Sequence, residues 1–263
     1  MLCKKPLTHL GFYGGSITSL QGWDANWLQN LQSLEITNLN FLEDNISSWF
    51  QKLSTLKRLR FSHLPEPSQQ NLISALEPVA KTLEELSLNF TQQIKPDPNE
   101  LCHLPLRPKT LTLINHNGSI DRLYQAGVMS KLEKLHLSGV DEEEQVKLTS
   151  ILSTLPTLKR VALCNITNTT NLLKSLIKAK KLEQLVLRNV DFDIPAFINL
   201  LESGFYAKVT QIEISTSRKV SKIELMHRLG HQVPLPKLQD RHLSRHLLCW
   251  NSALPLRLLD HLY

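Results

Sequence analysis

Residues 131–140 read KLEKLHLSGV and give the pattern on which the rest of the chain can be aligned. Leu132, Leu135, Leu137 and Val140 spell L-x-x-L-x-L-x-x-Φ, where Φ is an aliphatic residue. The alternation of apolar and polar residues from Leu135 onward predicts a short strand with one buried face. Because other segments echo this pattern, repeats have to be identified before any single motif is interpreted.

The central apolar residue of the pattern recurs nine times at a nearly constant interval. The nine positions are Leu10, Leu34, Leu59, Leu86, Leu111, Leu135, Val161, Leu185 and Ile212. The successive intervals are 24, 25, 27, 25, 24, 26, 24 and 27 residues. Leucine-rich repeats have this leucine spacing and a period of about 20–29 residues. The sequence therefore predicts about nine such repeats.

The second half of most repeats has apolar residues at the three- and four-residue spacing of a helix. Two such sets are Val146, Ile151, Leu152 and Leu155, and Leu172, Leu173, Leu176 and Ile177. Asp141 precedes three glutamates and is predicted to cap the first of these helices. Pro96 and Pro98 argue against a full helix in residues 90–104, where one 3₁₀ turn near Glu100 is expected.

The repeat resembles the ribonuclease-inhibitor-like class of leucine-rich repeats over about residues 7–230. The resemblance implies parallel strands that alternate with helices. The chain departs from that class where the consensus has Asn or Cys, because aliphatic residues stand there instead: Leu39, Leu64, Val140, Ile166 and Val190. Asparagine comes one residue earlier, at Asn38, Asn115, Asn165 and Asn189. The inner turn is therefore expected to be held by packing more than by a buried asparagine ladder.

The predicted fold is an α/β right-handed solenoid, or horseshoe, with the sheet on its concave face and helices on its convex face. It covers residues 1–236, and its last helix is expected at residues 218–233. Residues 237–263 do not fit the repeat and are predicted to form a helical cap. Leu243, Leu247 and Leu248 would give one apolar stripe, and Leu256, Leu259 and Leu262 a second. A detachable docking peptide or a secretion signal is the competing interpretation of this tail.

The composition indicates an intracellular protein. Four cysteines are scattered through 263 residues, which is typical of thiols in a reducing compartment. The first residues do not read as a signal peptide, and we expect no membrane span. The aliphatic-for-asparagine repeats are similar to those of NOD-like receptors and of the eukaryotic-like effectors that intracellular bacterial pathogens inject. The small size favours the effector class, which would place the protein in the host cytosol.

The residues between and after the strand leucines are expected to line the concave face, where a partner protein would bind. The candidate binding residues are Tyr13, Glu35, Arg58, Arg60, Glu85, Lys134, His136, Arg160, Arg188 and Glu213. The net charge of +6 and the basic residues of this face favour a partner with an acidic patch. Nucleic acid is disfavoured because Tyr13 is the one aromatic residue expected there.

Two arrangements suggest chemistry, and both are predicted to be structural. Cys164 and His136 fall on neighbouring strands, but catalysis would need a contact of roughly 3 Å and a third group to orient the imidazole. The histidine pairs 227/231 and 242/246 have the i, i+4 spacing of metal ligands without the glutamate of a zinc protease. We therefore expect no catalytic residues, no metal and no cofactor.

The sequence thus predicts a non-catalytic protein–protein interaction module, monomeric on its own, that occludes or regulates an enzyme. A substrate-recognition adaptor of a ubiquitin ligase, with residues 237–263 as its docking tail, is the first alternative. A ligand-sensing leucine-rich repeat protein is the second. Neither a nucleic acid nor a membrane is expected among its partners.

Overall fold

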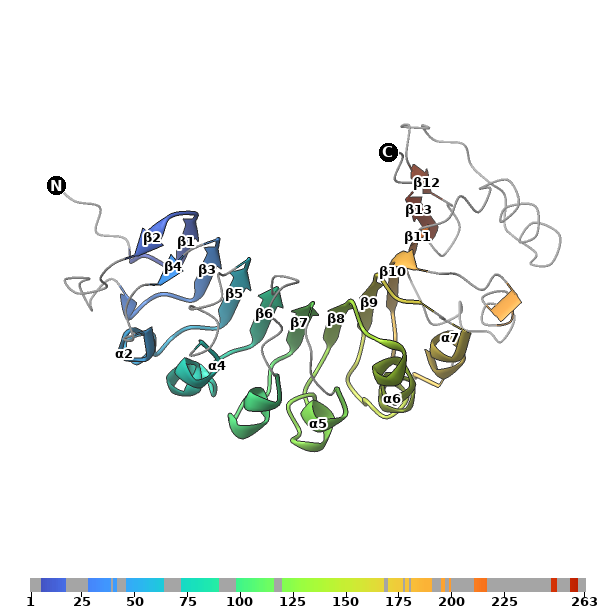
Figure 1. Ribbon diagram of the computed structural model, residues 1–263, viewed down its shortest axis with the longest axis horizontal. Helices are drawn as coiled ribbons and strands as arrows, with labels where there is room; N and C mark the ends of the chain where they lie inside the picture. Colours follow the sequence, from blue (N-terminus) through green and yellow to red (C-terminus); the bar gives the residue numbers. More distant parts are fainter. Residues whose placement is uncertain are drawn as a thin grey trace. The chain divides into compact units, whose positions relative to one another are not determined.

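The computed structural model describes most of the chain in two compact units, Met1–Leu132 and Glu133–Tyr263 (Figure 1). The described residues are 6–17, 28–38, 40–41, 46–63, 72–89, 98–115, 120–167, 170–176, 178–179, 181–190, 195–196, 199, 211–216, 247–249 and 256–259. The predicted last repeat helix at residues 218–233 lies outside them. The predicted boundary at residue 236 differs from the division between the units and stays a prediction.

The first unit is built on five parallel strands that lie side by side in chain order. They are β1 (His9–Tyr13), β3 (Ser33–Thr37), β5 (Arg58–Ser62), β6 (Glu85–Asn89) and β7 (Thr110–Ile114). Two short strands, β2 (Ser16–Ile17) and β4 (Asn40–Phe41), pair in parallel as a separate ribbon.

The second unit continues the same pattern with four parallel strands. They are β8 (Lys134–Ser138), β9 (Arg160–Cys164), β10 (Gln184–Val190) and β11 (Gln211–Thr216). Each of the nine predicted central apolar positions falls inside one of these nine strands, which confirms an open α/β arrangement of parallel strands with helices. The right-handed solenoid and its number of repeats stay predictions.

Short helices connect the strands on one side of each sheet (Figure 1). They are α2 (Ile46–Phe50), α4 (Leu72–Ala75), α5 (Ile120–Gln125), α6 (Glu142–Leu152) and α7 (Thr170–Leu176), with the 3₁₀ helices η1 (Glu77–Val79) and η2 (Pro98–His103). The prediction of a 3₁₀ turn near Glu100 is confirmed. Pro98 opens η2, where its missing N–H costs nothing because the first turn leaves that donor unused.

The core lies between the sheets and these helices. The first unit buries two rows of strand residues, Leu34, Leu59, Leu86 and Leu111, and Ile36, Phe61, Leu88 and Leu113. Trp49 and Phe50 of α2 are buried against this sheet, with the Phe50 and Phe61 rings edge to face at 6.3 Å. These two aromatic side chains therefore belong to the core of the first unit.

The residue that follows the strand core has a left-handed backbone in most repeats. The φ angle is positive at Gly14, Asn38, His63, Asn115, Gly139, Asn165 and Asn189. This explains why asparagine stands one residue earlier than in the family consensus: asparagine and glycine tolerate this conformation best. Val140, Ile166 and Val190, which follow, are buried, so packing holds the turn as predicted.

A chain of polar side chains, with both asparagines exposed and Ser138 buried, adds to that packing in the second unit. The Asn189 Nδ2 atom donates to Asn165 Oδ1 at 2.5 Å, and Asn165 Nδ2 donates to Ser138 Oγ at 3.0 Å. The asparagines therefore link neighbouring strand ends, but from the surface and not from the core.

Helix α6 begins as predicted but buries a different face. The Asp141 carboxylate accepts a hydrogen bond from the Glu144 N–H at 2.8 Å, which is the expected cap. Val146 was predicted to face the core, and this is wrong, because it is 67% exposed. Gln145 takes its place: its Nε2 donates to the Val140 carbonyl oxygen at 3.0 Å, so this buried amide is satisfied.

The predicted helical cap is wrong for the tail segments that the structure describes. Leu247–Cys249 form β12 and Leu256–Leu259 form β13; β13 pairs with β11 in parallel and β12 with β13 antiparallel. Short leucine-rich runs suit either a helix or a strand, and the open edge of β11 offers N–H and C=O groups that select the strand. Leu243 and Leu262 lie outside the described residues.

Asn38 provides a test of the left-handed turn. Valine at this position would be strained by its branched Cβ, whereas glycine would not. Asn38→Val should lower the free energy of unfolding by about 1–2 kcal/mol in urea titrations. Asn38→Gly should stay within about 0.5 kcal/mol of the wild type. Equal losses for both variants would show that the backbone conformation is not what selects asparagine here.

Truncation after residue 236 tests the role of the tail. Removing β13 leaves the backbone edge of β11 unpaired, and an exposed parallel edge is a site of association between chains. The truncated protein should elute as oligomers or aggregate in size-exclusion chromatography, while the full chain stays monomeric. A truncated chain that remains monomeric with an unchanged melting temperature would identify the tail as a dispensable segment.

Candidate functional site

The strand faces opposite the helices carry the candidate binding residues in ordered rows. In the first unit, parallel pairing aligns Gly11, Glu35, Arg60, Ser87 and Thr112 in one row. A second row contains His9, Ser33, Arg58, Glu85 and Thr110. We call this surface the first polar face. Neighbouring strands stand about 4.8 Å apart, so the backbone fixes the spacing of these side chains.

Tyr13, Glu35 and Arg60 form a chain of contacts across three consecutive strands. The Arg60 guanidinium lies 3.6 Å from the Glu35 carboxylate, an exposed pair that contributes little stability. Glu35 also raises the pKa of Tyr13, because its charge opposes the tyrosinate and its carboxylate accepts the phenol hydrogen bond. The Tyr13 ring lies over Gly11, where a Cβ atom would come within 2.8 Å of it.

A shallow hollow of about 240 Å³ opens in the first polar face. Its polar lining includes Glu35, Arg58, Arg60 and Glu85, together with Ser87, Thr110 and Thr112. Arg58 is exposed, and no carboxylate in the described part of the chain lies within ion-pair distance of it. The structure thus brings together four of the predicted binding residues, with a guanidinium available to a partner.

The second unit has a polar face of different charge, which we call the second polar face. The positions of β8, β9 and β10 that alternate with the core aliphatic residues are Lys134, His136, Ser138, Arg160, Ala162, Cys164, Gln184, Val186 and Arg188. Three of them, Ser138, Ala162 and Val186, are buried. Three others are cationic, and none of these positions is acidic. Arg160 is the register partner of both Lys134 and Gln184, so two of the cations are immediate neighbours. We refer to Lys134, Arg160 and Arg188 as the cationic patch.

Glu213 is the one acidic candidate in this unit. It lies in β11 opposite Val186 of β10 and Arg257 of β13 in register.

Within the second polar face, the Cys164 thiol contacts an imidazole. His136 Nε2 lies 3.3 Å from Cys164 Sγ, although the two residues are diagonal and not opposite in register. Burial lowers the pKa of His136, and the charges of Arg188 and Arg160 lower it further. The sequence placed this pair on neighbouring strands but could not give its separation.

An ionic ladder at the strand starts was not predicted. In the first unit, Glu84 lies 3.5 Å from the Lys57 amine and 2.9 Å from the Lys109 amine, and the hydrogen bond from Lys109 lowers its pKa most. In the second unit, Lys159 lies 3.2 Å from Glu133. The signal was available, because a charged residue precedes these strands and its sign alternates from one repeat to the next.

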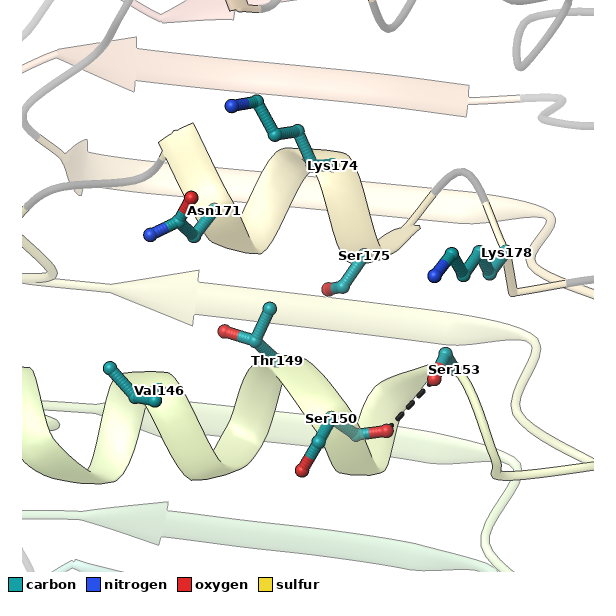
Figure 2. A pocket seen from close by; sticks show the side chains of 8 residues that line it. All are labelled: Val146, Thr149, Ser150, Ser153, Asn171, Lys174, Ser175 and Lys178. Atoms are coloured by element: carbon teal, nitrogen blue, oxygen red, sulfur yellow. Dashed lines mark hydrogen bonds between the residues drawn. The ribbon is translucent and has the colours of Figure 1, made fainter.

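A second hollow, of about 570 Å³, lies between α6 and α7 on the helical side (Figure 2). Thr149 and Ser175 point into the gap between the two helices. Its other lining residues are Val146, Ser150, Ser153, Asn171, Lys174 and Lys178. The hollow is open, and four of its eight lining residues carry short hydroxyl side chains.

The histidine pairs 227/231 and 242/246 lie outside the described residues. Within the described ranges, no group of three metal-ligating side chains comes together. None of the described helices combines the length and hydrophobicity needed to cross a bilayer.

Comparison with known proteins does not identify a family for this chain. No family model matches the chain, and no curated protein matches it.

The contact between Tyr13 and Glu35 can be tested by titration. Glu35→Gln removes the negative charge that opposes the tyrosinate, so the pKa of Tyr13 should fall toward its ordinary value. The pKa of Tyr13 is measured by following tyrosinate absorbance against pH. A Tyr13→Phe variant assigns the signal to this residue. Gly11→Ala should have the same effect with little loss of stability, because the added Cβ displaces only the end of a flexible side chain.

An unchanged titration of Tyr13 in Glu35→Gln would contradict the described geometry. A matched control is Glu85→Gln, which alters an exposed carboxylate two strands away from Glu35.

Proposed function

We propose that this protein is a non-catalytic interaction module that binds an acidic surface of a partner protein on its second polar face. The observation that carries the proposal is the cationic patch: three long basic side chains stand on adjacent parallel strands, and no position on that face of β8, β9 and β10 is acidic. Charged groups arranged in this way steer an oppositely charged partner and fix its orientation.

The backbone supports binding by limiting the entropy that is lost. Lys134 and Arg160 are fixed at one strand spacing by their register, and their strands are buried on the opposite face through Leu135 and Val161. A partner therefore meets a preorganised array and does not have to order a loop. Arginine is also over-represented among residues that dominate binding energy.

The first polar face is proposed as a separate binding surface of the first unit. Its charges are mixed, with Arg58 and Arg60 beside Glu35 and Glu85. Such a face favours a partner with both signs of charge, and it would contribute orientation more than attraction. Tyr13, which is 69% exposed, supplies an aromatic ring at its end.

The resemblance to injected effectors gives the proposal its setting. If the protein is such an effector, its partner is a host protein in the cytosol. The first candidate is an enzyme whose active site a polar face covers. In the alternative, the protein is a ubiquitin-ligase adaptor. The same faces would then bind a substrate, and a second surface would bind the ligase.

A comparative capture experiment tests the proposal. Wild-type protein and an Arg160→Glu/Arg188→Glu variant serve as baits, and captured proteins are quantified side by side by mass spectrometry. The affinity of the principal partner should fall at least about tenfold in the variant, because truncating one such arginine typically costs about 2 kcal/mol. Ligase subunits among the specific partners would favour the adaptor.

The matched control is Lys174→Glu/Lys178→Glu, which reverses two exposed cations on the helical side. Lys147 is unsuitable, because hydrogen bonds to Glu143 and Glu144 raise its pKa to about 12 and its reversal would disturb α6. A partner that is lost with the helical variant and kept with the strand variant would show that the wrong face had been chosen.

A further inference from the structure

The second polar face contains a nucleophile that partner binding does not require. Cys164 is a half-exposed thiol in β9, and His136 Nε2 lies 3.3 Å from its sulfur. The half-buried imidazole has its pKa lowered by burial and by two guanidiniums, so it is neutral near pH 7 and able to accept the thiol proton. Both a base and an accessible sulfur are therefore in place.

The charges around this pair favour an anion. Arg188 is the direct register partner of Cys164 on β10, and Arg160 stands four residues before Cys164 on the same face of β9. Both guanidiniums act electrostatically on His136. Positive charge next to a cysteine stabilises the thiolate, which is the attacking species in thiol chemistry, and attracts a reagent that carries carboxylates.

We propose that Cys164 is a reactive thiol that undergoes exchange with small anionic disulfides and so carries a reversible mixed disulfide. The inference does not depend on the proposed partner, because each step takes place on the protein alone. It also differs from catalysis: the product is a modified side chain, and no substrate is turned over.

The exchange balances within the two reactants. The Cys164 thiol gives its proton to His136, which passes it to solvent because the neighbouring guanidiniums disfavour the imidazolium. The thiolate then attacks one sulfur of the disulfide, a new S–S bond forms, and the old one breaks. The departing half leaves as a thiolate with the bonding electron pair, so Cys164 is oxidised and the disulfide reduced.

Two disulfide reagents test the inference on the full-length reduced protein. Dithiobis(nitrobenzoate) is anionic, whereas dithiodipyridine is uncharged near pH 7. Mass spectrometry of quenched digests follows each cysteine separately. With the anionic reagent, native Cys164 should react at least about tenfold faster than the half-exposed Cys102 of η2, and faster than Cys164 itself in the urea-unfolded chain.

Variants separate the two causes of fast reaction at Cys164, which are the proton acceptor and the positive charge. His136→Asn should slow both reagents by about tenfold, because it removes the proton acceptor. Arg160→Gln/Arg188→Gln should slow the anionic reagent by about threefold or more relative to the uncharged one, and added salt should do the same. The ratio of the Cys164 reaction rates in the native and the unfolded chain needs no variant. This ratio therefore tests the reactivity of Cys164 even if a variant does not fold. A native Cys164 that reacts no faster than in the unfolded chain would overturn the inference.

Discussion

In-register parallel pairing is the constraint on which the rest of this structure depends. Before most of the described strands, one backbone carbonyl accepts two N–H groups from the next repeat: the Gln32 carbonyl oxygen accepts from Lys57 and Arg58, both at 2.9 Å. The backbone carbonyl oxygens of Lys57, Glu84, Glu133 and Lys159 each accept a pair of hydrogen bonds in the same way. Because a slip of one residue would exchange buried and exposed faces, this pairing fixes the leucine core and the polar rows together.

The same register explains the distribution of charge. Strand starts carry alternating lysines and glutamates that neutralise one another within each unit, as in Lys57, Glu84 and Lys109. The cationic patch instead gathers charges of one sign, because none of the positions that alternate with the core residues in β8, β9 and β10 is acidic. The half-buried Cys164 and His136 lie on the same face as this patch.

The sequence predicted the strands well because leucine spacing encodes burial directly, and β-pairing then follows the period. It also located the Asn38, Asn115 and Asn165 positions but not their cause, since a left-handed φ angle is not visible in a residue pattern. Val146 was misassigned because Gln145, a polar residue, takes the buried place through a hydrogen bond. The tail was misassigned because pairing with β11 overrides local preference. The 3.3 Å contact of His136 and Cys164 depends on rotamers, which no spacing predicts.

Lysine footprinting of the complex tests the central claim most directly. Brief acetylation of the protein, alone and with its captured partner, reports how accessible each amine is. The account predicts that Lys134, on β8, is protected by the partner while Lys174, on α7, reacts as before. Protection of Lys174 with full reactivity at Lys134 would contradict it, because binding would then occur on the helices and not on the polar faces of the strands.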